Sequence, residues 1–274
     1  MKIALNGASG FVGTRLRERF RDHVIIEKTD NVDEILTKLD GVDVAINLAG
    51  APIIKKWDDE YKKVLIDSRI ESTQKLVQAV NKSDVKQLIS TSAIGIYPNN
   101  APYDEYCRDY ADDFLGKLAL AWEGEAKKCH KTTAILRLGV VLGKEGGALK
   151  QMLPPFKLGL GGTIGYGKMI TSWIDIDDLM NIYEFVIEKH LNGVFNAVSP
   201  NPVTNFELTK TLGKVLFRPT FLPLPESFLN VMFGEAASVV TDSKEVYPKF
   251  LQELQFKFSY PDIKSSLMHL LKNK

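Results

Sequence analysis

Three glycines near the start of the chain have the spacing of a phosphate-binding turn. The segment NGASGFVG (6–13) follows a short apolar run (3–5) and leads into a helical pattern. Gly7 would supply the positive φ that a tight strand-to-helix turn needs, and Gly10 would let the backbone approach a diphosphate without a Cβ in the way. Gly13 would let the helix pack closely on the strand. In this context the glycines predict a dinucleotide site, whereas alone they would indicate only a flexible turn.

The helix that follows the turn would contribute to the same site. Phe11 and Val12 in its first turn offer backbone N–H groups without helical partners, and the helix dipole adds partial positive charge there. Glu27 stands 20 residues after Gly7, where a carboxylate can bind the adenosine ribose diol and favours NAD. Lys28 could instead pair with a 2′-phosphate, which favours NADP. The spacing leaves both interpretations open, and in a third the two side chains only face solvent.

Strand-like and helix-like segments alternate over the first two-thirds of the chain. Short runs rich in β-branched residues are each followed by a helical pattern or a turn. These runs lie at 3–5, 24–26, 43–50, 86–93, 133–143 and 193–198. Such alternation predicts parallel βαβ units with right-handed crossovers. We therefore expect an α/β fold, a Rossmann-type doubly wound parallel sheet, with ligands at the carboxyl ends of its strands.

The composition changes at about residue 150. The stretch MLPPFKLGLGGTIGYG (152–167) is rich in glycine and proline and is typical of loops, and prolines punctuate short helical patterns near the end of the chain. We predict a dinucleotide-binding core over 1–149, to which 173–198 returns, and a smaller C-terminal substrate-binding lobe over 150–274. Three aromatic residues are candidates for pocket walls or else plain core residues: Phe156, Tyr166 and Trp173.

Composition also limits the expected partners. The 274 residues are 45% hydrophobic and 25% charged with a net charge of +1, which argues for a soluble globular protein and against nucleic acid or an acidic membrane as the main partner. Cys107 and Cys129 are too few for a disulfide framework or a zinc site, and no other metal-ligand spacing is recognisable, so we expect no metal. The N-terminal pattern does not fit a signal peptide, and no run approaches the ~18 apolar residues of a membrane span. We expect a cytoplasmic protein with a small-molecule substrate, and a homodimer stays open.

Further sequence blocks give the chain a family resemblance. The glycine turn is followed in order by NLAG (47–50), STSAIGIY (90–97), ILRLGVVLG (135–143) and SWIDIDDL (172–179). With these blocks the chain resembles the extended short-chain dehydrogenase/reductase family. LAGAPI, DSRIEST, SAIGIY and GGALKQMLPPFKLGLGG resemble the epimerase family proteins within it, which are often labelled nucleoside-diphosphate-sugar epimerases. The resemblance implies NADP, with NAD as the alternative, and an oxidoreductase or epimerase that acts on a carbonyl or hydroxyl of a small substrate such as a nucleotide sugar.

The same resemblance assigns cofactor contacts. Three residues after a central strand would pass under the adenosine half of the cofactor and contact it through their backbone: Leu48, Ala49 and Gly50. Arg69 falls at a cofactor-contacting position, where its planar fork could bind a phosphate, although a surface ion pair with Asp67 or Glu71 is the alternative. Val141 would lie on the turn that faces the nicotinamide.

The catalytic positions implied by the resemblance are only partly filled. In this family a tyrosine moves the substrate's proton, and a lysine four residues later lowers the tyrosine pKa from about 10. Ser92 fits the serine that binds the substrate oxygen, with Thr91 as the alternative, and Lys117 fits the lysine. The residue four before Lys117, however, is Asp113. We treat a Tyr-x-x-x-Lys match at Tyr260 as accidental, because a proline follows the tyrosine.

Three accounts of the chemistry follow from the missing tyrosine. A tyrosine from another loop delivers the proton, with Tyr97 as the first candidate and Tyr103 and Tyr110 as alternatives. Asp113 acts as the acid, although a carboxyl with a pKa near 4 is a poor donor at neutral pH. In the third account no redox chemistry occurs, and the chain is a non-catalytic NAD(P)H-binding sensor.

The acidic pair in SWIDIDDL has a structural interpretation. Paired carboxylates suggest acid–base chemistry or a metal, but too few other ligands are spaced around Asp177 and Asp178. We expect one of the two to cap a helix that begins at about Leu179.

Overall fold

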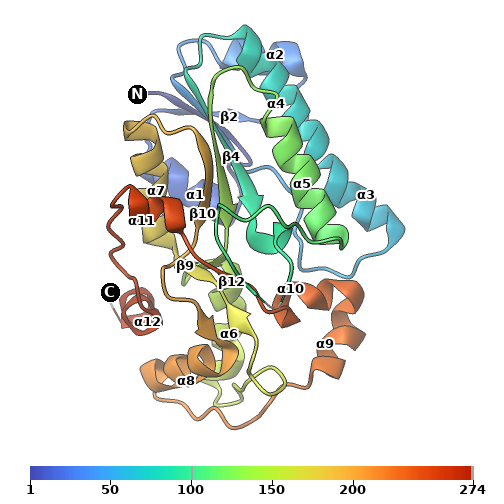
Figure 1. Cartoon of the computed structure of the whole chain (residues 1–274), viewed down its shortest axis with the longest axis vertical. Helices are drawn as coiled ribbons and strands as arrows, with labels where there is room; N and C mark the ends of the chain where they lie inside the picture. The colour runs from blue at the N-terminus through green and yellow to red at the C-terminus, as the bar shows by residue number, and fades with distance from the viewer. Residues whose placement is uncertain (100, 273–274) are drawn as a thin grey trace.

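The fold is built around a six-stranded parallel sheet (Figure 1). The structure, a computed structural model, describes residues 1–99 and 101–272. In the order in which they lie side by side, the strands are β10 (Gly193–Ala197), β6 (Thr132–Leu138), β4 (Gln87–Ala93), β3 (Val44–Asn47), β1 (Ile3–Asn6) and β2 (His23–Ile26). Every neighbouring pair is parallel. The predicted α/β fold with a Rossmann-type sheet is confirmed.

Helices cover both faces of this sheet. They are α1 (Phe11–Arg19), α2 (Val32–Lys38), α4 (Ile70–Lys82), α5 (Phe114–Ala126) and α7 (Ile176–Glu188). Ile3 and Leu5 of β1 belong to a hydrophobic cluster with Leu16 of α1. Ala4 belongs to a second cluster with Leu76 of α4. Because successive side chains of a strand point to opposite faces, this alternation in β1 gives the sheet an apolar layer on each side.

The strand order reverses between β1 and β3. From β1 the chain crosses to β2 on one side and then returns through α2 to β3 on the other side. At such a switch point the connections leave in opposite directions, so that a crevice forms at the carboxyl ends of the strands. The turn after β1 begins at Gly7 and the segment after β3 begins at Leu48. Two of the segments predicted to bind the cofactor therefore border this position.

The rest of the chain adds smaller elements, and α6, α8 and α9 form the lower end of the molecule in Figure 1. The remaining helical elements are α3 (Asp59–Asp67), η1 (Ile94–Ile96), α6 (Gly147–Lys157), α8 (Asn205–Leu216), α9 (Glu226–Phe233), η2 (Gly234–Ala237), α10 (Ser238–Thr241), α11 (Lys249–Glu253) and α12 (Ile263–Lys272). Short strands pair as β7 (Val140–Leu142) with β9 (Trp173–Asp175), β8 (Ile170–Thr171) with β11 (Val203–Thr204), and β5 (Pro102–Tyr103) with β12 (Glu245–Val246). No helix in the described ranges has the length and apolarity to cross a bilayer.

Some of the smaller elements share a hydrophobic core with the sheet. Leu153 of α6, Leu212 of α8 and Leu267 of α12 belong to the same cluster as the residues of β1. Phe156 and Trp173 are buried in this cluster. Tyr166, the third pocket-wall candidate, is 91% exposed. The domain boundary expected at residue 150 lies inside α6 and stays a prediction.

Three local expectations were wrong. The stretch 152–167 is not all loop, because α6 extends to Lys157 and contains Pro154 and Pro155. Its apolar side chains are buried, and this packing outweighs the backbone hydrogen bonds that proline cannot donate. Val141 does not lie on a turn, because the run 133–143 divides at Gly139 into β6 and β7, and Val141 belongs to β7. A Cβ on that glycine would come within 2.6 Å of the Ser172 carbonyl oxygen, so the chain bends there against β9.

The third correction concerns the helix in SWIDIDDL. It begins at Ile176 and not at Leu179, and Asp175 caps it by accepting a hydrogen bond from the Asp177 amide at 2.9 Å. Asp178 instead accepts hydrogen bonds from the backbone amides of Ser259 and Tyr260, both at 2.8 Å. Both acids therefore act on structure, as expected, but neither is the cap.

Candidate cofactor-binding site

At two of the three glycine positions in the turn, contacts within the fold exclude a side chain, and the contacts differ between the two. Gly7 has φ +93°, and a Cβ there would come within 2.8 Å of the Leu48 carbonyl carbon. A Cβ on Gly13 would come within 2.4 Å of the Gly7 carbonyl oxygen, so the helix packs directly against the turn. At Gly10 the nearest atom to an added Cβ is 3.5 Å away, which is ordinary contact. The fold itself therefore tolerates a side chain at position 10, and the remaining reason for glycine there is the approach of a ligand.

The first turn of α1 is open to an anion. Gly10 is its N-cap, no side chain caps the helix, and the first turn carries no acidic residue. The amides of Phe11 and Val12 therefore point out of the helix start with the positive end of its dipole. The Phe11 ring is held by the loop after β7, because a Cβ on Gly146 would come within 2.1 Å of its Cδ2. Val141 lies in β7, at the base of this loop.

A buried network of amides and hydroxyls fixes the ends of β1 and β3. The Asn6 amide donates to Asn47 Oδ1 at 3.0 Å, and the Asn47 amide donates to Thr73 Oγ1 at 2.8 Å. The indole of Trp122 also donates to Thr73 Oγ1, at 2.9 Å. Asn47 Oδ1 further accepts a hydrogen bond from the amide of Ala49 at 3.4 Å. The backbone under the predicted adenosine site is thus positioned by residues from four elements.

Arg69 is a half-buried cation without a carboxylate partner among the described residues. Its guanidinium donates to the carbonyls of Leu65 and Ala51 at 3.2 and 3.1 Å, and its Cζ lies 5.3 Å from the Trp122 ring centre. A Cβ on Gly50 would come within 3.0 Å of that Cζ. Burial lowers the pKa of Arg69 to about 10. A desolvated charge of this kind beside the cofactor segment is suited to an anionic ligand.

The surface ion pair considered for Arg69 is not formed. Neither Asp67 nor Glu71 lies within ion-pair distance of its guanidinium, so that interpretation was wrong.

Glu27 and Lys28 both lie exposed just after β2. The Glu27 amide donates to Asp30 Oδ2 at 2.7 Å, and that carboxylate is paired with Lys38 at 2.5 Å. In the described part of the chain the Lys28 ammonium takes part in no ion pair. The side chains that would distinguish a ribose diol from a 2′-phosphate are therefore both free to meet a ligand.

Ser92 and Tyr97, predicted to touch the substrate, lie inside a buried network. Ser92 is 1% exposed and donates to Glu123 Oε1 at 2.8 Å. Arg137 forms two hydrogen bonds with the same carboxylate, at 2.7 and 2.9 Å, and donates to the Tyr97 hydroxyl at 2.7 Å. Tyr97 is 0% exposed and donates to Asn196 Oδ1 at 3.0 Å, and burial raises its pKa to about 12. This geometry favours structural roles for both residues.

Thr91, Tyr103 and Tyr110 lie close to this network. Thr91 Oγ1 is 3.1 Å from the hydroxyl of Tyr183, and the ring of Tyr103 stacks on Tyr97 with centres 5.4 Å apart. Tyr110 lies with its ring centre 5.7 Å from the Arg137 Cζ. The network was not expected from the sequence. The sequence feature that could have revealed this network is the arginine in the middle of the apolar strand ILRLG. A buried arginine needs an acidic partner, so this residue would have predicted a buried acid.

Lys117 and Asp113 do not form a pair. Asp113 is the N-cap of α5 and accepts a hydrogen bond from the Gly116 amide at 2.8 Å. The Lys117 side chain is 67% exposed and pairs with Asp112 at 2.8 Å. This lysine lowers the pKa of Asp112 through a hydrogen bond and its charge. The structure thus places the predicted catalytic lysine on a solvated face of the helix, and its catalytic role stays a prediction.

The face of α5 that meets the end of β4 is otherwise apolar. Glu123 contacts Ser92, and the helix repeat places Ala119 and Leu115 one and two turns earlier on the same face. Leu115 lies against η1, because a Cβ on Gly95 would be 3.7 Å from its Cβ. The two positions of this face that approach the carboxyl end of the sheet therefore carry no group that can exchange a proton.

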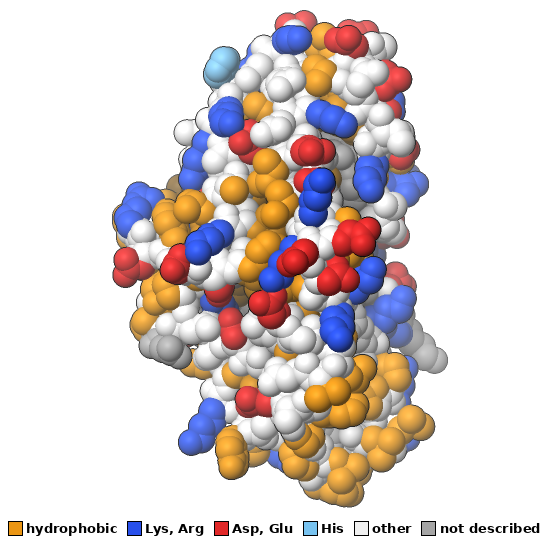
Figure 2. Space-filling model, turned by 90° about the vertical axis from the view of Figure 1, so that its right-hand side faces the viewer, with side chains coloured by type: hydrophobic (Ala, Val, Ile, Leu, Met, Phe, Trp, Pro, Cys, Tyr) orange, Lys and Arg blue, Asp and Glu red, His pale blue; other side chains and the backbone are white. Residues whose placement is uncertain are grey.

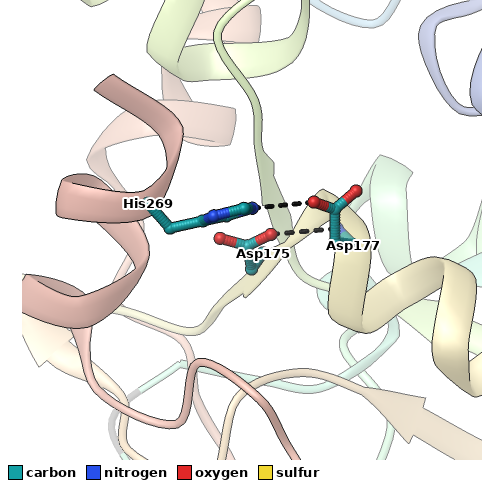
Figure 3. A group of neighbouring side chains, drawn as sticks. All are labelled: Asp175, Asp177 and His269. Atoms are coloured by element: carbon teal, nitrogen blue, oxygen red, sulfur yellow. Dashed lines mark hydrogen bonds and ion pairs between the residues drawn. The ribbon is translucent and has the colours of Figure 1, made fainter. Parts of the chain in front are cut away.

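Figure 3 shows a cluster of Asp175, Asp177 and His269 that joins α7 to α12. The Asp177 carboxylate lies 2.7 Å from His269 Nε2 and accepts a hydrogen bond from Arg15 at 2.8 Å. Asp175 is fully buried and accepts from Ser266 Oγ at 2.6 Å, and burial raises its pKa to about 6. The three ligand atoms lie within 4.8 Å of one another, as a metal would require. The carboxylates, however, already bind protein donors and a guanidinium, which suits a structural junction.

Comparisons with known proteins agree with this geometry. Residues 3–197 match the model of the NAD dependent epimerase/dehydratase family, and residues 224–270 match a domain of unknown function. The chain is 36% identical over 99% of its length to a chloroplastic epimerase family protein of Arabidopsis thaliana, SDR39U1 homolog, of which it covers 87%. It is 33% identical to YfhF of Bacillus subtilis, with 100% of this chain and 99% of that protein covered.

A solved structure extends the similarity to three dimensions. The structure of human epimerase family protein SDR39U1 with NADPH has a TM-score of 0.93 to this chain, with 32% identity and 100% of both chains covered. A dTDP-4-dehydrorhamnose reductase from Bacillus anthracis in complex with NADP has a TM-score of 0.81 at 17% identity, with 99% of this chain and 98% of that chain covered. The second likeness concerns the fold alone.

Proposed function

We propose that the chain, which belongs to the NAD-dependent epimerase/dehydratase family, binds NADP(H) at the carboxyl ends of β1 and β3. We further propose that it acts as an oxidoreductase or epimerase on a small substrate. Family membership supports a nicotinamide cofactor. One observation carries the proposal to these residues. The glycine turn stands at the topological switch point, and no contact within the fold requires glycine at position 10.

Each part of the site has a task in this proposal. The amides at the start of α1, those of Phe11 and Val12, bind the diphosphate, and Arg69 adds a positive charge beside Gly50. The segment from Leu48 supports the adenosine half through its backbone. The nicotinamide supplies or accepts a hydride when it is bound.

The preference for NADP over NAD rests on two supports. The related human structure is described with NADPH, and Lys28 offers a cation after β2 that forms no ion pair with a described residue. Glu27 beside it opposes a phosphate, and it would favour the diol of NAD. We therefore expect NADPH to bind more tightly than NADH, and a titration of each against nicotinamide fluorescence tests this order.

A second function is favoured by the region around β4. The hydroxyls of Ser92 and Tyr97 are bonded inside the protein, and Lys117 is on the surface. An NADP(H)-binding sensor without redox turnover needs none of these groups. Incubation with NADPH and a panel of carbonyl compounds separates a reductase from the sensor, because only a reductase oxidises the cofactor. An epimerase returns the hydride to its substrate, so it is tested instead by isomerisation of nucleotide sugars in the presence of the cofactor.

The variant Gly10→Ala tests the cofactor site directly. Its Cβ fits the protein without a bound ligand, with φ −70° and the nearest atom 3.5 Å away, but it would occupy the path of a diphosphate. We expect NADPH affinity to fall at least about tenfold while the thermal midpoint is unchanged. Gly124→Ala, at an open position of α5, is the matched control and should keep full affinity. Equal affinities of the two variants would overturn the assignment.

A further inference from the structure

The lower end of the molecule exposes an unusual share of its hydrophobic side chains. Of the 17 large hydrophobic residues exposed in the described ranges, ten lie between residues 158 and 232. Figure 2 shows hydrophobic side chains gathered at this end. Monomeric proteins seldom leave such side chains grouped, and a grouped set marks an interaction surface. The cofactor site uses none of these ten residues.

Two loops carry five of these ten side chains, and we name them together the lobe tip (157–160 and 217–222). They lie side by side, because Arg218 Nε donates to the Lys157 carbonyl at 2.8 Å. Leu158, after α6, is 74% exposed, and Phe221, after α8, is 70% exposed. Three more apolar side chains of the lobe tip are exposed: Leu160, Phe217 and Leu222.

The sequence around the lobe tip is basic throughout. Residues 146–174 and 208–225 contain no aspartate or glutamate. Their cations are Lys150, Lys157, Lys168, Lys210, Lys214 and Arg218. Lys272 of α12 adds another, with its ammonium 4.7 Å from the Phe217 ring centre. The near-neutral charge of the whole chain, +1, therefore does not exclude a locally positive surface at the lobe tip. Of these cations, Lys150 lies beside α1, and the nearest acids in sequence are Glu207 and Glu226, in the first turns of α8 and α9.

A shallow basic cavity, widely open to solvent, lies beside the lobe tip. It has a volume of about 500 Å³ at the C-terminal end of α8, and the residues that line it are Lys210, Gly213, Lys214, Phe217, Arg218, Pro219 and Thr220. The Lys210 ammonium is held there by the carbonyl and hydroxyl oxygens of Thr220, at 2.7 and 3.1 Å. Lys214 takes part in no ion pair with a described residue. No acidic side chain lines the cavity, so it is suited to an anionic group.

We propose that the lobe tip docks on an anionic lipid bilayer surface. Its exposed side chains, led by Leu158 and Phe221, would enter the interfacial region, and Lys210, Lys214 and Arg218 would bind headgroup phosphates. A second copy of this chain fits less well, because a two-fold contact would bring the same cations together. This surface association needs no membrane-spanning helix. It does not rest on the proposed cofactor function, and it replaces the expectation that membranes are not partners.

Sedimentation of the full chain with lipid vesicles tests the apolar part of the proposal. Binding is expected with phosphatidylcholine–phosphatidylglycerol vesicles but not with phosphatidylcholine alone, and added salt should weaken it. Leu158→Ser combined with Phe221→Ser should weaken it at least about tenfold. The matched control is Val231→Ser with Met232→Ser on α9, which removes two exposed apolar side chains outside the basic segments and should keep binding. Equal binding to both vesicle types, or none, would overturn the proposal.

Charge reversal tests the electrostatic part. Lys214→Glu with Arg218→Glu should weaken binding to the anionic vesicles at least about twentyfold, because both cations face the surface. Lys75→Glu with Lys82→Glu on α4 makes the same change in net charge elsewhere and should have a much smaller effect. Thermal unfolding of each variant is the check that it is folded.

Two further arms identify other occupants. If free glycerol phosphate binds the cavity but anionic vesicles do not sediment the chain, the site is one for a small phosphate and the proposal fails. If gel filtration shows a dimer that Leu158→Ser with Phe221→Ser dissociates, the occupant is a second copy and the proposal also fails. A monomer that sediments only with anionic vesicles supports it.

Discussion

The carboxyl ends of β1 and β4 lie in the same sheet but differ in what their polar groups do. After β1, the first amides of α1 have no capping side chain and Arg69 has no carboxylate among the described residues. At the end of β4, Ser92 in the strand and Tyr97 just after it are each bonded to protein partners in the interior. Unsatisfied groups at a surface are available to a ligand, whereas satisfied groups in a core are not. The difference indicates that cofactor binding, and not a side-chain proton relay, is what the fold leaves open.

The largest effect should come from disrupting the buried network of Ser92, Glu123 and Arg137 at the end of β4. Glu123→Ala leaves Arg137 charged and buried without its carboxylate, which costs about 3–5 kcal/mol. Urea unfolding should therefore show a much lower free energy of unfolding. Replacing both partners, Glu123→Leu with Arg137→Met, should recover most of the loss. If Glu123→Ala were as stable as the wild type, the network would be open to water, and the difference between the ends of β1 and β4 would be smaller than described.

A pH titration sharpens the same contrast at α7. Because the pKa of Asp175 is about 6 in the folded chain and about 3.9 when unfolded, the folded state holds an extra proton between these values. This carboxyl should therefore reduce the free energy of unfolding as pH rises from about 4 to 6, by roughly 2–3 kcal/mol. Asp175→Asn keeps a capping side chain but does not titrate. Its stability relative to wild type should rise over that window, and parallel curves would contradict the buried charge.

At the end of β1, where polar groups are available to a ligand, Arg69→Met should lower cofactor affinity and change the free energy of unfolding much less. Loss of a charge-assisted contact to a phosphate costs about 1.5–3 kcal/mol, so NADPH affinity should fall about tenfold or more. The free energy of unfolding should change little, because two lost hydrogen bonds are offset by relief of a desolvated cation. Fluorescence titration and urea unfolding measure the two effects. Arg17→Met on the exposed side of α1 is the control, and an equal fall in its affinity would remove Arg69 from the site.

The smallest effect is expected at Lys117. Because the Lys117 side chain is 67% exposed and pairs with exposed Asp112, Lys117→Ala should change NADPH affinity by less than about twofold. Any turnover found with a carbonyl substrate should survive in this variant. If turnover is lost while affinity is kept, the lysine reaches the substrate in the complex, and the catalytic prediction from the sequence is restored.

The fold could be predicted because its signals are local. The glycine turn at residues 7–13 and the alternation of strands and helices each lie within short windows of sequence, and the doubly wound sheet follows from them. The same local reading gave the wrong prediction for α6, because prolines such as Pro154 and Pro155 are common in loops. Here burial of the helix against distant elements keeps them helical. Helix limits near Asp175 were missed for a related reason, because several acids could equally have been the cap.

The region after β4 could not be predicted because its partners are far apart in sequence. Ser92, Glu123 and Arg137 come from two strands and a helix, and only the folded chain brings their side chains together. Their spacing relative to Lys117 suggested a catalytic set, but the helix turns that lysine to solvent. For the cofactor segment the sequence was sufficient, since backbone amides and missing Cβ atoms depend on local geometry alone.

The hydrophobic cluster common to the sheet and to α6, α8 and α12 restricts how the molecule can move. A lobe with a core of its own could swing as a rigid body about a hinge and admit ligands between two domains. Here such a swing would disrupt the packing of Leu153, Leu212 and Leu267 within this cluster and expose part of it to water. We therefore expect substrate access to come from displacement of single loops or short helices, and we expect the elements that share this cluster to unfold as one cooperative unit.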